Sequence, residues 1–181
     1  VGYGSVVFTK TRRDRDGEKT EFELDEKDKK ELLSIARKTI EEYLKSSKSL
    51  DFKLKSKILN EKHAAFVTLK LHGELMGCIG HLVARLPLWQ TVRDMALAAA
   101  FEDPRFQPVK KEELKDIKIE ISVLSPLKKI KDADEIELGK HGVIVQRNGN
   151  SGVFLPQVAT ETKWSKEKFL SELCSQKAGL S

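Results

Sequence analysis

Residues 65–80 read AFVTLKLHGELMGCIG and predict a β-hairpin. Along 65–71, small or aliphatic side chains alternate with polar or aromatic ones, which is the pattern of a strand with one buried face. A turn is predicted at 72–74, where a glycine stands between two polar residues, and 75–80 returns as the second strand.

The segments outside this hairpin show both helical and extended patterns. Helices are predicted over 25–45, 88–102 and 165–179, a strand over 117–124, and a second hairpin over 143–155 with its turn at 148–151. No regular strand–helix–strand repeat connects them. The pattern therefore predicts an α+β fold, with a mostly antiparallel sheet and flanking helices.

The length of 181 residues fits a single domain, which we place over 25–181. Residues 10–21 are dense in charge and have almost no apolar side chain, so they predict a mobile loop or tail. Residues 1–9 contain a short apolar run that suits an edge strand. We therefore expect 1–24 to be a mobile or edge-strand segment.

Charge and cysteine content narrow the class of protein. The formal net charge is +5, from 33 basic and 28 acidic residues, and the sequence does not localise a basic patch for nucleic acid. Two cysteines, Cys78 and Cys174, predict a reducing compartment and hence the cytoplasm. The longest apolar run, 95–101, is too short to span a membrane, and no signal-peptide pattern opens the chain.

Cys78 lies between Gly77 and Gly80 in the second strand of the hairpin, and this is the sequence's most informative feature. Glycine weakens a strand unless the backbone must bend or another group must approach closely. Two interpretations follow. Cys78 is a small buried residue in a tightly packed strand, or it is a reactive or ligand-binding thiol beside an opening.

A reactive thiol needs a partner that lowers its pKa. His81 is the nearest candidate, but residues three apart in a strand point to opposite faces, so this dyad requires a turn at Gly80. Glu120 and His141 are alternatives from other segments. Without a catalytic role, Glu120 would be a solvated residue on the polar face of its strand, and His141 would be an ordinary loop histidine.

Asp103 and Arg105 frame Pro104 in a loop. They form an ion pair in a turn, or they present the Arg105 guanidinium as a clamp for a carboxylate or phosphate. Gln157 follows Pro156 at the end of the second hairpin and offers an amide to a ligand. No metal-ligand spacing and no phosphate-binding glycine loop is present, so we expect no metal and no cofactor.

The chain resembles the AMMECR family over roughly residues 25–180. The resemblance rests on six strings in order: LMGCIG at 75–80, DPRF at 103–106, EISVLSP at 120–126, GKHG at 139–142, FLPQV at 154–158 and KAGL at 177–180. Two departures matter. Met76 stands where the family usually has arginine; if that arginine is an essential anion ligand, this protein is impaired or uses Arg105 instead. Members commonly continue past the last string, so we expect a truncated C-terminus.

The resemblance implies two unequal lobes with a cleft between them and with the cysteine string near that cleft. In bacteria and archaea the family often occurs as component A of the AmmeMemoRadiSam gene set. This implies a shared modification pathway, with MEMO-like and radical-SAM proteins as functional context.

Two functions follow for the expected cleft, and the sequence slightly favours the first. An enzyme would use Cys78 as nucleophile or ligand, Glu120 or His141 for acid–base help, and Arg105, with Asp103, Gly77, Gly80 and Gln157, to bind substrate. A non-catalytic domain would recognise a peptide, a nucleotide or a partner protein through the same residues. Direct nucleic-acid binding is a third hypothesis, and it requires a basic patch.

Overall fold

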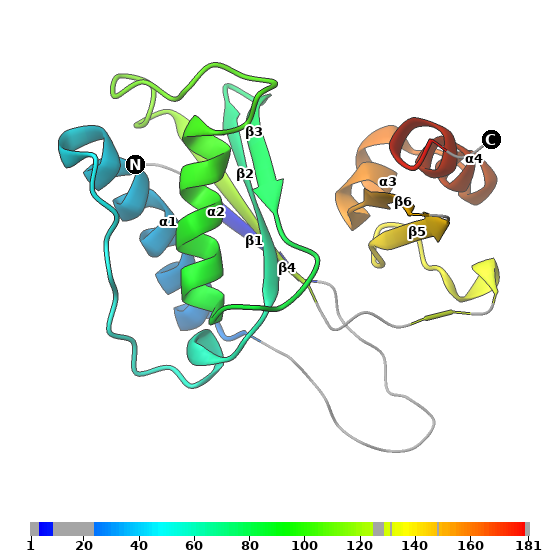
Figure 1. Ribbon diagram of the computed structural model, residues 1–181, viewed down its shortest axis with the longest axis horizontal. Helices are drawn as coiled ribbons and strands as arrows, with labels where there is room; N and C mark the ends of the chain where they lie inside the picture. The colour runs from blue at the N-terminus through cyan, green and yellow to red at the C-terminus, as the bar shows by residue number, and fades with distance from the viewer. Residues whose placement is uncertain (1–3, 9–23, 125–128, 131, 148, 180–181) are drawn as a thin grey trace. The chain divides into compact units, whose positions relative to one another are not determined.

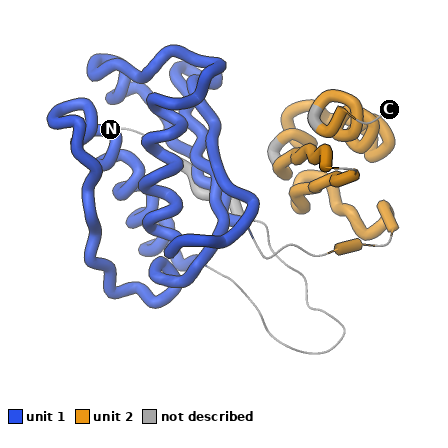
Figure 2. Tube along the Cα trace, in the orientation of Figure 1, with its two compact units in different colours: residues 1–126 blue, residues 127–181 orange. Residues whose placement is uncertain are grey.

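The computed structural model describes residues 4–8, 24–124, 129–130, 132–147 and 149–179. These residues form two compact units, Val1–Pro126 and Leu127–Ser181 (Figure 2). The predicted mobile segment at 10–21 lies outside the described residues.

Unit 1 is built on a four-stranded sheet with the order β1-β4-β2-β3. The strands are β1 (Gly4–Phe8), β2 (Ala64–Leu71), β3 (Glu74–Gly80) and β4 (Ile117–Leu124). β2 pairs antiparallel with β3 and with β4, whereas β1 adds to β4 in parallel at one edge. The predicted first hairpin and the strand at 117–124 are confirmed.

Two helices cover one face of this sheet (Figure 1). α1 (Glu26–Ser46) begins at Asp25, whose carboxylate accepts a hydrogen bond of 2.7 Å from the Asp28 amide. α2 (Leu88–Phe101) follows Pro87 and contributes small residues such as Ala96 and Ala99 to the core. The buried alternate residues of β2 and β4 complete that core, as the alternating pattern predicted.

An extra residue in β3 sets which side chains face the helices. Leu69 pairs with Gly77 but Lys70 pairs with Leu75, so Met76 has no partner on β2 and forms a β-bulge. Beyond the bulge, Gly77 and Ile79 face the core and Cys78 faces away from it.

The two glycines of the cysteine string are explained by close contacts on opposite faces. A Cβ on Gly77 would lie 2.0 Å from the Ala99 carbonyl oxygen, because the α2 backbone packs directly on β3 there. A Cβ on Gly80 would lie 2.2 Å from the Phe66 ring. Both glycines therefore permit tight packing, as the first of the two interpretations expected, whereas Cys78 itself is only half-buried.

Unit 2 contains a hairpin and a group of short helices. The hairpin is β5 (Val143–Arg147) and β6 (Asn150–Phe154), and the helices are α3 (Pro156–Thr162), α4 (Lys166–Glu172) and a π-helical turn, η3 (Leu173–Lys177). α4 starts at Ser165 as predicted, with the serine hydroxyl accepting from the Lys168 amide. The hydrophobic core of unit 2 centres on Phe169 and Leu173, which are fully buried.

α3 was not predicted, and this corrects the assignment of residues 156–157 to the end of the hairpin. Pro156 is the first residue of the helix, where its missing N–H and fixed φ are favourable. Gln157 therefore belongs to a helical first turn. The α+β class is confirmed, and none of the described helices combines the length and apolarity that crossing a bilayer requires.

Gly77→Ala tests the close approach of α2 to β3. The added methyl would meet a main-chain oxygen that no side-chain rotation can move, so we expect a loss of at least about 2 kcal/mol in the free energy of unfolding. Urea denaturation followed by Trp89 fluorescence, in a Trp164→Phe background, measures unit 1. Gly142→Ala, followed by Trp164 fluorescence in a Trp89→Phe background, is the control, because a Cβ at Gly142 meets only ordinary contacts at 3.5 Å and beyond. Equal losses in the two variants would contradict the close-packing explanation.

Candidate functional site

Cys78 lies on β3, at one edge of the described sheet, on the face that α1 and α2 do not cover. Its cross-strand partner is Thr68 on β2, and the partner of Thr68 on the other side is Glu120 on β4. The three residues therefore form a polar row across three neighbouring strands. Adjacent strands are about 4.8 Å apart, so the whole row is within the span of a small ligand.

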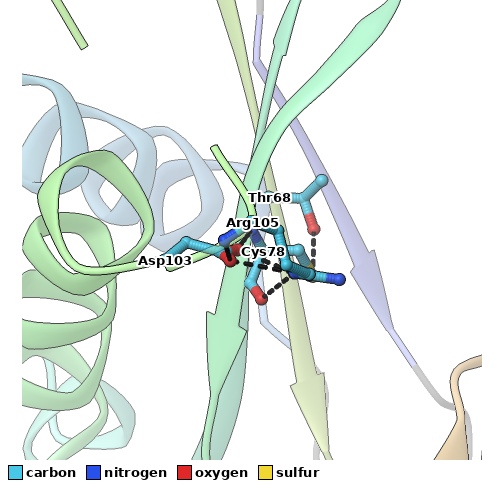
Figure 3. Close-up of polar contacts among 4 residues, drawn as sticks. All are labelled: Thr68, Cys78, Asp103 and Arg105. Atoms are coloured by element: carbon cyan, nitrogen blue, oxygen red, sulfur yellow. Dashed lines mark hydrogen bonds and ion pairs between the residues drawn. The ribbon is translucent and has the colours of Figure 1, made fainter. Parts of the chain in front are cut away.

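The Cys78 thiol is half-buried and free, and Thr68 is its hydrogen-bond partner. The Thr68 hydroxyl donates to Sγ at 3.2 Å (Figure 3). The amide and carbonyl of Cys78 both point away from β2, which makes this a non-hydrogen-bonded pair of the antiparallel ladder. Side chains in such pairs lie especially close, which accounts for the contact.

Asp103 and Arg105 bind the outward-facing main chain of Cys78 (Figure 3). The Cys78 amide donates to Asp103 Oδ2 at 2.9 Å, and Arg105 Nη2 donates to the Cys78 carbonyl at 3.1 Å. The two side chains are joined by a bidentate pair, from Arg105 Nε to Oδ1 at 2.9 Å and from Nη2 to Oδ2 at 2.7 Å. We call this arrangement the Asp103–Arg105 clamp.

The clamp gives Cys78 the main-chain partners that a further strand would otherwise provide. An exposed edge strand offers unpaired N–H and C=O groups that promote aggregation. Here a carboxylate accepts from the amide and a guanidinium donates to the carbonyl. The clamp therefore protects the edge and holds Cys78 in register with Thr68.

The electrostatics of the clamp follow from its geometry. The Asp103 side chain is only 1% exposed, and its hydrogen bond from Arg105 lowers its pKa to about 2, with the Cys78 amide adding to the effect against the opposing cost of burial. The same hydrogen bond raises the pKa of Arg105, whose side chain is 52% exposed. The ion-pair alternative proposed from the sequence is thus the one observed, and its guanidinium is also bound to a main-chain carbonyl.

Glu120 lies beside two lysines. Lys70 Nζ is 3.1 Å from Glu120 Oε2, and Lys118 Nζ is 3.4 Å from Glu120 Oε1. The Glu120 side chain is 13% exposed, so it is a partly buried group rather than a freely solvated one. Thr68 stands between this charged group and the Cys78 thiol.

Of the histidines and the glutamine predicted for the site, His81 belongs to unit 1, whereas His141 and Gln157 belong to unit 2. His81 is exposed, and its amide donates to the Ala65 carbonyl at 3.1 Å. In unit 2, His141 Nδ1 accepts from the Glu137 amide at 3.1 Å within a turn.

Thr68 is the site residue that sequence reasoning missed. Continued without an extra residue, the ladder would place Cys78 opposite Val67, on the core face. The bulge at Met76 changes that register. The signal in the sequence was the Met76-Gly77 pair ahead of the cysteine, but neither residue alone predicts a bulge.

No group of three or more histidine, cysteine, aspartate or glutamate side chains that could hold a metal ion occurs among the described residues. The groups that the structure places on this face of unit 1 are the Cys78 thiol, the Thr68 hydroxyl, Glu120 with its two lysines, and the Asp103–Arg105 clamp.

The fold and the clamped cysteine strand define a class of α+β protein with a row of polar residues on the sheet face that α1 and α2 leave uncovered. The AMMECR1 family model matches residues 33–181, and the chain belongs to this family. Protein NEQ441 of Nanoarchaeum equitans is 43% identical over 159 residues, which covers 82% of this chain and 86% of that protein. Protein MK0488 of Methanopyrus kandleri is 44% identical over 158 residues, or 82% and 76% of the two chains.

A solved structure is also similar. The crystal structure of the uncharacterised protein PH0010 from Pyrococcus horikoshii is 40% identical, with a TM-score of 0.78 over 82% of this chain and 78% of that one. This similarity covers most of both chains and agrees with the α+β class.

Asp103→Asn tests the contribution of the clamp to stability. The folded pKa of Asp103, about 2, lies below its ordinary value of 3.8, so its charge stabilises the fold above about pH 4, and this stability is lost as the pH falls toward 2. The difference in pKa corresponds to about 2 kcal/mol at neutral pH. We expect the gap in unfolding free energy between the parent and the Asn variant to be at least that large at pH 7 and to shrink between pH 4 and pH 2.

Urea denaturation at several pH values, followed by Trp89 fluorescence in the Trp164→Phe background, measures this gap. Asp116→Asn is the control, because Asp116 is exposed and its side chain makes no hydrogen bond or ion pair with the described residues. A gap for Asp103→Asn that does not change with pH would contradict the assigned role of the charge.

Proposed function

We propose that this protein is a recognition domain that holds a polar ligand on the sheet face around Cys78. The observation that carries the proposal is how Cys78 is held. The Asp103–Arg105 clamp binds its main chain, whereas its thiol contacts the neutral hydroxyl of Thr68. A nucleophilic thiol needs a base or a cation directed at the sulfur. The Arg105 guanidinium is bound to Asp103 and to the Cys78 carbonyl. The Glu120 carboxylate is paired with Lys70 and Lys118.

The groups beside the thiol suit a ligand that both donates and accepts hydrogen bonds. The Thr68 hydroxyl, the Glu120 carboxylate and the ammonium groups of Lys70 and Lys118 are all on the face that carries Cys78. A peptide, a nucleotide or a segment of a partner protein presents complementary groups. Arg105 keeps a half-exposed guanidinium at the border of this surface, although two of its nitrogens are engaged by the clamp.

The family resemblance supports a wider role for this recognition. We place the domain in a modification pathway with MEMO-like and radical-SAM proteins, in which it presents or positions the acceptor. We also place it in the cytoplasm, because its two cysteines are free thiols and suit a reducing compartment.

An enzyme with Cys78 as nucleophile is the second candidate, and one observation favours it. The half-buried thiol is in the same row as the Glu120 carboxylate, with Thr68 between them. A substrate lying across this row would contact a thiol at one end and a carboxylate at the other.

Substitution of Cys78 separates the two candidates. Serine keeps the size and hydrogen bonding of cysteine but is a much weaker nucleophile, whereas methionine is bulkier and has no nucleophilic thiolate. We expect Cys78→Ser to restore the metabolite and RNA-modification profile of cells that lack the gene, and Cys78→Met to leave the profile of the deletion. Both profiles are measured by mass spectrometry, one on extracted metabolites and the other on nucleosides from digested RNA.

Cys174→Ser is the matched control, because it makes the same change at the other cysteine and should restore the profile. Equal protein levels and melting temperatures establish that each variant folds. If Cys78→Ser matches the deletion, the enzyme is favoured and the recognition proposal is wrong. If Cys78→Met restores the profile, neither candidate uses this face.

A further inference from the structure

We propose that unit 1 binds the phosphodiester backbone of a nucleic acid in a groove distinct from the Cys78 site. Two adjoining hollows, of about 440 and 360 Å³, lie along α1 and share Arg37 and Glu41 in their linings. We call them together the cationic groove. Its basic side chains are Lys30, Arg37, Lys38, Lys45, Lys111 and Lys115.

Helical spacing aligns the cations of α1. The basic residues recur about every two turns of the helix, which returns them to the same side. Arg37 and Lys38 follow Lys30 by seven and eight residues, and Lys45 follows them by eight and seven. From Lys30 to Lys45 the helix rises about 22 Å, at about 1.5 Å per residue. Lys111 and Lys115 supply the opposite border from the turns that precede β4.

Arg37 fixes the two borders of the groove to each other. Its guanidinium donates to the Leu114 carbonyl at 2.6 Å and to the Ile117 carbonyl at 2.5 Å. Burial lowers the pKa of Arg37 and nearby Glu41 opposes that shift. Because arginine is always protonated in proteins, the fixed charge stays in the floor of the groove.

The lining of the groove carries an excess of positive charge. It is lined by six basic residues and by one acidic residue, Glu41. The chain has 33 basic and 28 acidic residues, so 27 of each remain outside the groove and cancel. A basic patch that the linear sequence did not localise is therefore assembled by the fold from two distant segments.

The five lysines of the groove are exposed, and none makes an ion pair with any residue that the structure describes. Two nearby carboxylates have other contacts: Glu42 accepts from the Ser46 hydroxyl, and Glu113 accepts from the Lys110 amide. Asp116, next to Lys115, has no side-chain contact with the described residues. A concentration of one sign of charge is unfavourable by itself and attracts a partner of opposite sign.

The shape and length of the groove favour a phosphodiester backbone over a membrane. Membrane-surface helices insert an apolar face, but the apolar side of α1 is buried in the core at Leu32, Ile35 and Ile40. Tyr43 is exposed at 36%, and its ring stacks on Phe101 at 4.7 Å. A partner with a charge on every repeating unit matches cations spread over about 22 Å, and counterion release then drives binding.

Binding is tested with fluorescein-labelled 20-mers of single-stranded RNA, double-stranded RNA and duplex DNA, by anisotropy with the full chain. If about four phosphates are contacted, raising the salt from 50 to 200 mM should weaken binding by roughly 50- to 150-fold. The variant Lys38→Gln, Lys45→Gln, Lys111→Gln and Lys115→Gln should weaken binding at 50 mM salt at least about tenfold and flatten the salt dependence.

The matched control replaces Lys53, Lys55, Lys57 and Lys62 by glutamine, which removes the same charge from exposed positions of unit 1 outside the groove. It should bind as the parent does, and circular dichroism verifies the fold of both variants. The nucleic acid that binds most tightly of the three identifies which type of phosphodiester backbone the groove recognises.

Equal losses in the two variants would show attraction to net charge alone and would overturn the proposal, as would absence of binding to all three nucleic acids. Vesicles with anionic lipids and poly-glutamate are the comparison ligands. Groove-dependent binding to either of them, without binding to nucleic acid, would also overturn it. None of these outcomes depends on Cys78, so the recognition proposal is tested separately.

Discussion

The register of β3 against β2 is the constraint on which the candidate site depends. An antiparallel ladder alternates strictly, so a single extra residue exchanges the two faces of everything that follows it. Met76 is that residue, and beyond it Gly77 faces α2 while Cys78 faces the open side of the sheet. The Ala99 carbonyl of α2 then packs on Gly77, and four residues later Asp103 meets the Cys78 amide. Bulge, close helix packing and clamp thus form one geometric unit.

This dependence explains which features of the fold and site could be predicted from the sequence. The strand over 117–124 has isoleucine and valine at alternate positions, so its limits and its buried face follow from two-residue periodicity. The role of Asp103 and Arg105 did not follow, because their partner is the main chain of Cys78, which is 25 and 27 positions away. The local sequence indicated an ion pair or an anion clamp, and only the tertiary structure shows that the pair hydrogen-bonds to the main chain of an edge strand.

The missed helix α3 has a different cause. Proline after a strand was interpreted as the end of a hairpin, although the first position of a helix accepts proline equally well. The basic groove was missed for a third reason. The spacing of Lys30, Lys38 and Lys45 was visible on one helix, but Lys111 and Lys115 reach it only through the tether of Arg37 to the main chain.

Arginine and lysine have separate tasks in unit 1, and this separation bears on what each surface can recognise. Arg37 and Arg105 both use their planar forks on main-chain carbonyls, where fixed geometry holds one segment to another. The exposed charges of the cationic groove are otherwise lysines, which act as point charges on flexible stems and impose no bidentate geometry. Such a groove is suited to a backbone of repeated charge and not to reading bases, since the commonest specific base contact is a bidentate one to guanine. Specificity in this protein would therefore come from the fixed groups around Cys78, and the groove would supply affinity without sequence preference.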